Sequence, residues 1–167
     1  EMPRSLTYVQ GALAEIVSRI VEKEHGSILI FLPPGCETAG IGHELSIAYN
    51  TEGPDVGEVV AMVLAMQRGD TQSILDRWNY SIRNIASISQ MDGALVFDAR
   101  FKLVGVKGII NCPFPDERNI LGVTPGEYTP QGACHEPFDI GNYGTRHRSA
   151  ISFAHRFPGS FVIVVSQ

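Results

Sequence analysis

The sequence predicts an α/β fold in which a single central, mostly buried mixed β-sheet is flanked by helices. Short, continuous apolar runs end in turn residues, which is typical of buried strands. Segments with helical spacing of apolar residues alternate with these runs, as in a layered fold around one sheet. The chain has 167 residues, of which 44% are hydrophobic and 19% charged. We therefore expect residues 1–167 to form one domain with a proper core.

Apolar side chains recur at helical spacing over residues 6–24 and 71–89, and these segments are predicted to be helices. Residues 55–67 are apolar on most faces and are predicted to form a buried helix. Residues 146–156 are predicted to form a further helix. Five strands are expected, at residues 27–32, 43–49, 94–98, 102–110 and 160–166, with a tight turn at Ala99-Arg100 between the third and the fourth.

Residues 111–143 have little periodicity and are rich in proline and glycine. A long irregular loop inside a compact domain is unusual and is often functional.

Composition narrows the classes of function. The formal net charge is -5 and the sequence pI is about 5.5, which argues against nucleic-acid binding by this domain. The three cysteines form no Cys-x-x-Cys pair, which favours a reducing, cytoplasmic location. No apolar run approaches the roughly 20 residues of a membrane span, so no membrane segment is expected. The abrupt ends suggest a fragment of a longer protein.

The segment Gly144-Thr145-Arg146-His147-Arg148-Ser149 concentrates positive charge in this acidic chain. Between Gly144 and Arg156 there are three arginines and two histidines, and no acidic residue. Free N–H groups at a helix start, a hydroxyl and guanidinium groups together bind anions, most simply a phosphate chain. A small phosphorylated ligand is therefore predicted here, although a solvated basic helix start is the plainer alternative.

Asp92-Gly93-Ala94 lies where a predicted helix gives way to a strand. Gly93 and Ala94 leave room for a ligand to approach the backbone, and Asp92 offers a hard oxygen ligand for Mg²⁺ or Mn²⁺. A simple turn is the plainer alternative for these three residues.

Together, Met91-Asp92-Gly93-Ala94 and Gly144-Thr145-Arg146-His147-Arg148 resemble the two hallmark motifs of the diadenylate cyclase domain, of the type found at the N-terminus of DNA-integrity-scanning proteins. The flanking helices and strands also follow in the same order, over most of the chain. The resemblance implies a nucleotidyltransferase of second-messenger signalling. Two domains face each other as a homodimer or larger homo-oligomer, and they condense two ATP into cyclic di-AMP with release of pyrophosphate.

The resemblance also implies roles for individual residues. Asp92 would hold the Mg²⁺ or Mn²⁺ ion. The residues implied to be catalytic are Asp92, Arg146, His147 and Arg148. The residues implied to bind the nucleotide are Gly93, Ala94, Gly144, Thr145, Ser149, Ser166 and Gln167.

Two features depart from the family pattern. Gln167 stands where the family usually has a glutamate near the metal, and an amide cannot supply that charge. The loop at about 111–143 is also enlarged. Both favour an alternative function, a catalytically weak or inactive sensor that binds a nucleotide and signals to another domain.

Several other residues have alternative interpretations. Cys112, Cys134, His135 and Glu136 share the enlarged loop and offer metal ligands, but their spacing fits no standard zinc pattern. Trp78 is expected to be a core or interface anchor, with stacking on a base as the alternative. Tyr128 and Tyr143 are candidates for stacking on adenine.

Overall fold

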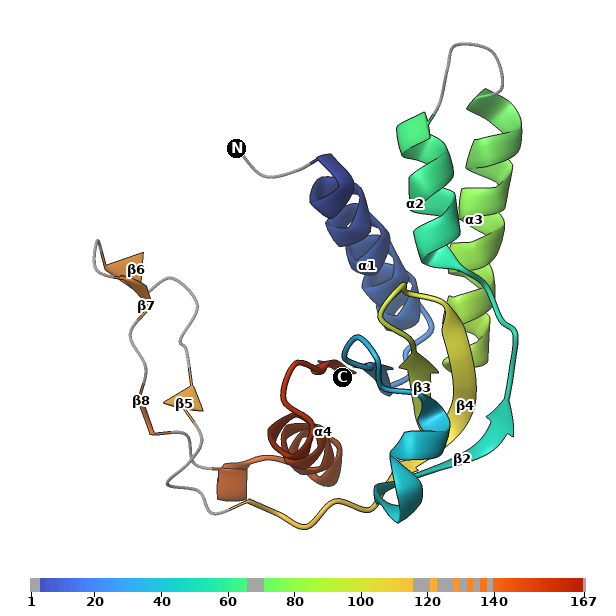
Figure 1. Cartoon of the computed structure of the whole chain (residues 1–167). Helices are drawn as coiled ribbons and strands as arrows, with labels where there is room; N and C mark the ends of the chain where they lie inside the picture. The colour runs from blue at the N-terminus through green and yellow to red at the C-terminus, as the bar shows by residue number, and fades with distance from the viewer. Residues whose placement is uncertain are drawn as a thin grey trace.

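A computed structural model of the chain describes residues 4–65, 71–115, 121–122, 128–129, 132–133, 136–137 and 140–166. The helices and strands alternate as the sequence predicts (Figure 1). The α-helices are α1 (Arg4–Glu22), α2 (Val56–Ala65), α3 (Thr71–Ile88) and α4 (Thr145–Arg156). The main strands are β1 (Ser27–Phe31), β2 (Leu45–Asn50), β3 (Ala94–Phe97), β4 (Leu103–Ile110) and β9 (Phe161–Val165).

These five strands form one mixed sheet in the order β2-β4-β3-β1-β9. β1 runs parallel to β3, and the other neighbouring pairs are antiparallel. The helices α1, α2 and α3 lie on one side of this sheet and α4 lies on the other (Figure 1). The predicted fold class, a mixed sheet flanked by helices, is therefore confirmed.

Two hydrophobic clusters hold the layers together, one on each face of the sheet. Because successive side chains of a strand point to opposite faces, β1 contributes to both clusters. Leu29 and Phe31 belong to the cluster under α1, α2 and α3. Ile28 and Ile30 belong to the cluster under α4, together with Phe153 of that helix.

The α1–α3 contact includes a polar anchor. Trp78 Nε1 on α3 donates a hydrogen bond to Glu15 Oε2 on α1 at 3.0 Å, and Arg19 donates to the other carboxylate oxygen. The indole also packs against the first cluster. The expectation that Trp78 is a core anchor agrees with this position, and base stacking would require the side chain to leave it.

The structure differs from the sequence-based prediction in the exposure of α2 and in the start of β2, and α1 runs from Arg4 to Glu22 where residues 6–24 were expected. Residues 55–67 were expected to be a buried helix, but only one face of α2 is buried, and Leu64 is 43% exposed. The reason is that α2 packs against its two neighbouring helices and nothing in the described residues covers its outer face. The strand expected at residues 43–49 begins only at Leu45, because Gly42–Glu44 form the 3₁₀ turn η2.

Most of the described residues between 111 and 143 lie in short paired strands or in a 3₁₀ turn, where the sequence predicted an irregular loop. β5 (Leu121–Gly122) pairs with β8 (Glu136–Pro137), and β6 (Tyr128–Thr129) pairs with β7 (Gly132–Ala133). A 3₁₀ turn, η4 (Ile140–Asn142), leads into α4. Across the described residues, no helix is both long and apolar enough to cross a bilayer.

Candidate functional site

The candidate site is built around the N-terminus of α4. Gly144 precedes the helix with an extended backbone (φ -66°, ψ 166°), and no described side chain caps it. Arg148 N donates to Gly144 O at 3.2 Å, which closes the first helical turn. The N–H groups of Thr145, Arg146 and His147 therefore have no acceptor within the helix. Together with the positive end of the helix dipole, they favour an anion at this point.

A hollow of about 510 Å³ opens at this helix start. It is larger than the hollows on the outer side of α1 and α3, which measure about 320 and 290 Å³ and are lined by side chains of both charge signs. Its volume suits a nucleotide-sized ligand. We call it the α4 hollow, and its lining residues are Gly144, Thr145, Arg146, His147 and Ser166.

Arg146 extends from α4 to the start of β1. Its Nη1 atom lies so close to Gly26 that a Cβ atom on Gly26 would overlap it. Ser27 pairs with Val165 in the antiparallel β1–β9 ladder, so the next residues outward, Gly26 and Ser166, face each other. The Arg146 guanidinium thus lies at the end of the sheet where β1 begins and β9 ends.

Asp92 lies near the same end of the sheet, because it shortly precedes β3. In the parallel β1–β3 ladder, Ile28 pairs with Ala94. Gly26 and Asp92 each lie two residues before this pair, so both are near the end of the sheet where β1 and β3 begin, although Asp92 belongs to a bend outside the ladder. Asp92 is exposed and therefore accessible to a ligand, although it does not line the α4 hollow itself.

The two residues after Asp92 have structural reasons for being small. Gly93 has a φ of +104°, and a Cβ atom there would lie 2.8 Å from the Cα atom of Lys107 on β4. Ala94 is 1% exposed and belongs to the cluster under α4. Packing is thus a sufficient reason for their size, and the expectation that they leave room for a ligand stays a prediction. Any contact of Ala94 with a ligand must use its backbone.

Arg148 and Ser149 lie outside the α4 hollow. The Arg148 guanidinium carbon lies 4.3 Å from the centre of the Phe114 ring, and its Nε atom is buried without a hydrogen-bond partner among the described residues. Ser149 is half-buried. Of the five motif residues from Gly144 to Arg148, the structure therefore brings four together and separates Arg148.

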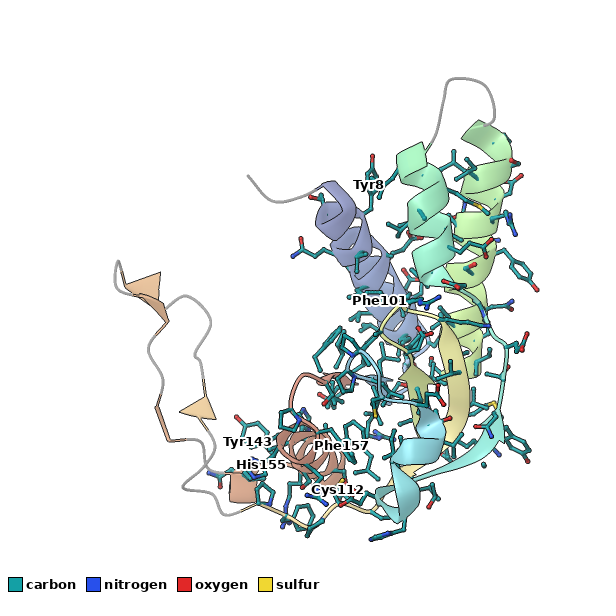
Figure 2. All side chains as sticks on the ribbon, viewed as in Figure 1. Tyr8, Phe101, Cys112, Tyr143, His155 and Phe157 are labelled. Atoms are coloured by element: carbon teal, nitrogen blue, oxygen red, sulfur yellow. The ribbon has the colours of Figure 1, made fainter. Side chains whose placement is uncertain are left out.

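Tyr143 and Tyr128 are the aromatic candidates for stacking on adenine. The Tyr143 ring lies 5.6 Å from the His147 ring, next to α4 (Figure 2). It is thus close to the hollow, in line with the proposed stacking role. Nothing is described of the Tyr128 side chain. Gln167, Cys134 and His135 lie outside the described residues.

Two contributors were missed by sequence reasoning. The sequence analysis gave neither Gly26 nor Phe114 a role in the site. Gly26 precedes β1 in the sequence, as Asp92 precedes β3. This similarity in position indicates that the two residues are near each other only once β1 and β3 are known to be neighbouring parallel strands. Nothing in the sequence indicates that Phe114 would pack on Arg148.

The available protein ligands suit an ion such as Mg²⁺ that also binds phosphate oxygens of the substrate. Among the described residues, no group of three or more His, Cys, Asp or Glu side chains forms a metal cage. Mg²⁺ is usually held by one or two carboxylates plus phosphate oxygens and water, and Asp92 is an exposed carboxylate that offers one such ligand. The loop candidate Cys112 is less suitable as a ligand. Burial, assisted by the nearby Glu44, raises the pKa of its thiol, and Arg156 only partly offsets this. Cys112 lies beside α4 (Figure 2).

Comparison with known proteins adds little. No family model matches the chain, and no curated protein is significantly similar in sequence. Among solved structures, the chain is similar to one described as a hypothetical membrane spanning protein from Bacillus cereus, with a TM-score of 0.49 and 15% sequence identity. The match covers 98% of this chain and 55% of that one, so this chain spans about half the length of the matched protein. A similarity at this level supports no functional argument.

Proposed function

We propose that this chain is a nucleotide-binding domain that condenses two ATP molecules into cyclic di-AMP, as its resemblance to diadenylate cyclases implies. The main observation in favour is that Asp92 and the Arg146 guanidinium lie near the same end of the sheet, where β1 and β3 begin. The two residues are 54 positions apart in the sequence. Gly26 and Asp92 each lie two residues before the paired residues Ile28 and Ala94 at the start of β1 and β3, and the Arg146 guanidinium packs against Gly26.

The proposed chemistry follows from these positions. The 3′-hydroxyl oxygen of one ATP attacks the α-phosphorus of the other, the bond to pyrophosphate breaks, and the hydroxyl proton is lost. Two such steps give cyclic di-AMP and two pyrophosphates. In phosphoryl transfer, catalysis is mostly positioning and stabilisation of charge. Arg146 and the first N–H groups of α4 would hold the triphosphate and stabilise the charge on the leaving pyrophosphate.

Asp92 is the residue that would hold a Mg²⁺ or Mn²⁺ ion. When bound, such an ion neutralises phosphate charge and favours ionisation of the attacking hydroxyl. His147 lines the hollow and would contact the phosphate chain. Arg148 packs on Phe114, so it would contribute only if its side chain turns into the hollow when the nucleotide binds.

Incubation of the purified chain with ATP and Mn²⁺, followed by chromatography of the products, tests the proposal. Cyclic di-AMP and pyrophosphate should accumulate, and the rate per molecule should rise with protein concentration because two domains must meet. Asp92→Asn and Arg146→Ala should abolish the product, whereas Asp76→Asn and Arg100→Ala, which alter exposed residues elsewhere, should not. Absence of cyclic di-AMP at all protein concentrations would contradict the cyclase function.

The position of Arg148 favours a second candidate function. A domain whose second motif arginine lies outside the hollow, and whose loop is enlarged, could bind a nucleotide without turning it over. In that case the chain is a sensor derived from a cyclase. Calorimetry would then detect binding of ATP or cyclic di-AMP without product formation. Lack of binding of ATP, ADP and cyclic dinucleotides would rule this function out.

A further inference from the structure

Gly26 connects α1 to β1 and is buried, although it has no catalytic chemistry of its own. Its backbone does not adopt the left-handed conformation that favours glycine. What excludes a side chain is space. A Cβ atom would overlap Nη1 of Arg146 and would lie 3.1 Å from both Cζ of Arg146 and the carbonyl oxygen of Val165.

We infer that Gly26 is a positioning residue for Arg146, and that its missing side chain forms the recess in which the guanidinium is held beside the α4 hollow. This inference rests on the proposed function, because it assigns Arg146 to the binding of a phosphate chain.

The recess matters because Arg146 is otherwise exposed. A long, exposed arginine samples many rotamers, and fixing it when a ligand binds costs entropy. Packing against Gly26 restricts the guanidinium before the anion arrives. With a Cβ atom on residue 26, the guanidinium would be displaced from the end of the sheet near Asp92 and Ser166.

Calorimetry with inorganic tripolyphosphate measures this effect without involving the adenine base or turnover. Gly26→Ala should weaken binding about tenfold, comparable to the lower limit expected for losing one charge-assisted hydrogen bond. Gly40→Ala is the matched control, since a Cβ atom at Gly40 meets nothing within 4 Å. It should bind like the wild type.

A double-mutant cycle separates positioning from a general structural effect. If Gly26 acts through Arg146, then Gly26→Ala should cost nothing further in a chain that already carries Arg146→Ala. The double variant should also recover thermal stability that Gly26→Ala alone has lost, because the overlapping guanidinium is gone. This second readout keeps the test decisive even if the single variant folds poorly.

The outcomes separate the two proposals. Wild-type affinity in Gly26→Ala, or losses that simply add in the double variant, would overturn the role of Gly26 and leave the cyclase proposal standing. Binding of tripolyphosphate with the expected cycle, but without cyclic di-AMP formation, would overturn the cyclase proposal alone. If the wild type does not bind tripolyphosphate, both are wrong.

Discussion

Arg146 and Arg148 are two positions apart on the first turn of α4, yet their guanidinium groups lie in different surroundings. Arg146 reaches Gly26 at the sheet edge, and Arg148 packs on the Phe114 ring. In a helix, residues two apart point in clearly different directions, so one motif cannot place both side chains in the same hollow without further movement. The sequence predicts which residues carry positive charge, but only the fold shows where each charge lies.

Glu15 allows a prediction of pH dependence. The hydrogen bond from Trp78 lowers the pKa of Glu15 below its ordinary value of 4.5, with Arg19 and Arg83 assisting and burial opposing. Because the pKa is lower in the folded state, the stabilisation is complete above pH 4.5 and is lost as the pH falls through the folded pKa. Glu15→Gln should lower the free energy of unfolding by about 1 kcal/mol at pH 7.

Urea unfolding of wild type and Glu15→Gln between pH 7 and pH 3 checks this prediction. The difference between the two proteins should shrink toward acidic pH. Glu22→Gln, at an exposed position of the same helix, serves as the control and should have little effect at any pH. A constant difference at every pH would mean that the charge on Glu15 is not what links α1 to α3.

At the scale of elements, the site depends on the parallel pairing of β1 with β3. The apolar runs and helical periodicities predicted the bounds of these elements to within two residues, since both signals are local. Strand order is not local. Asp92 and Gly26 lie near the same end of the sheet only because β3 runs parallel beside β1, and no property of either segment specifies that neighbour. The convergence on one edge could therefore be expected only from the family resemblance.

Two glycines test how the elements constrain the site. Gly93→Ala should destabilise the protein by about 1–3 kcal/mol, because φ of +104° is unfavourable for alanine and the Cβ atom would press on the β4 backbone. Gly11→Ala in α1 should stabilise it by about 0.5–1 kcal/mol, because Gly11 is in open space and alanine is the better helix former. Thermal and urea unfolding measure both changes. If Gly93→Ala is neutral, the close approach of Lys107 to Gly93 is wrong.

At the scale of the whole molecule, the sheet separates two hydrophobic clusters. The face under α1, α2 and α3 is packed by the larger hydrophobic cluster and stabilises the fold. The N-terminus of α4, on the other face, opens into the α4 hollow. In the sequence, Gln167 comes two residues after Val165, the last residue of β9. Its role remains a prediction from the sequence, because the residue lies outside the described part of the chain.

Gln167→Glu tests whether a missing carboxylate limits turnover. If the site is otherwise competent, the added charge should raise the rate of cyclic di-AMP formation about tenfold, equivalent to about 1.4 kcal/mol of transition-state stabilisation. Gln10→Glu, at an exposed position of α1, is the matched control for the added charge. A rate unchanged by Gln167→Glu would remove this explanation for weak catalysis.

The most direct test of the account is the affinity for a non-hydrolysable ATP analogue, measured by calorimetry with and without Mn²⁺. If Asp92 and Arg146 bind the same nucleotide, Mn²⁺ should strengthen binding to the wild type. Asp92→Asn should lose that gain but keep the metal-free affinity. Arg146→Ala should lose about 1.5–3 kcal/mol under both conditions. A full Mn²⁺ effect in Asp92→Asn, or unchanged affinity in Arg146→Ala, would contradict the account.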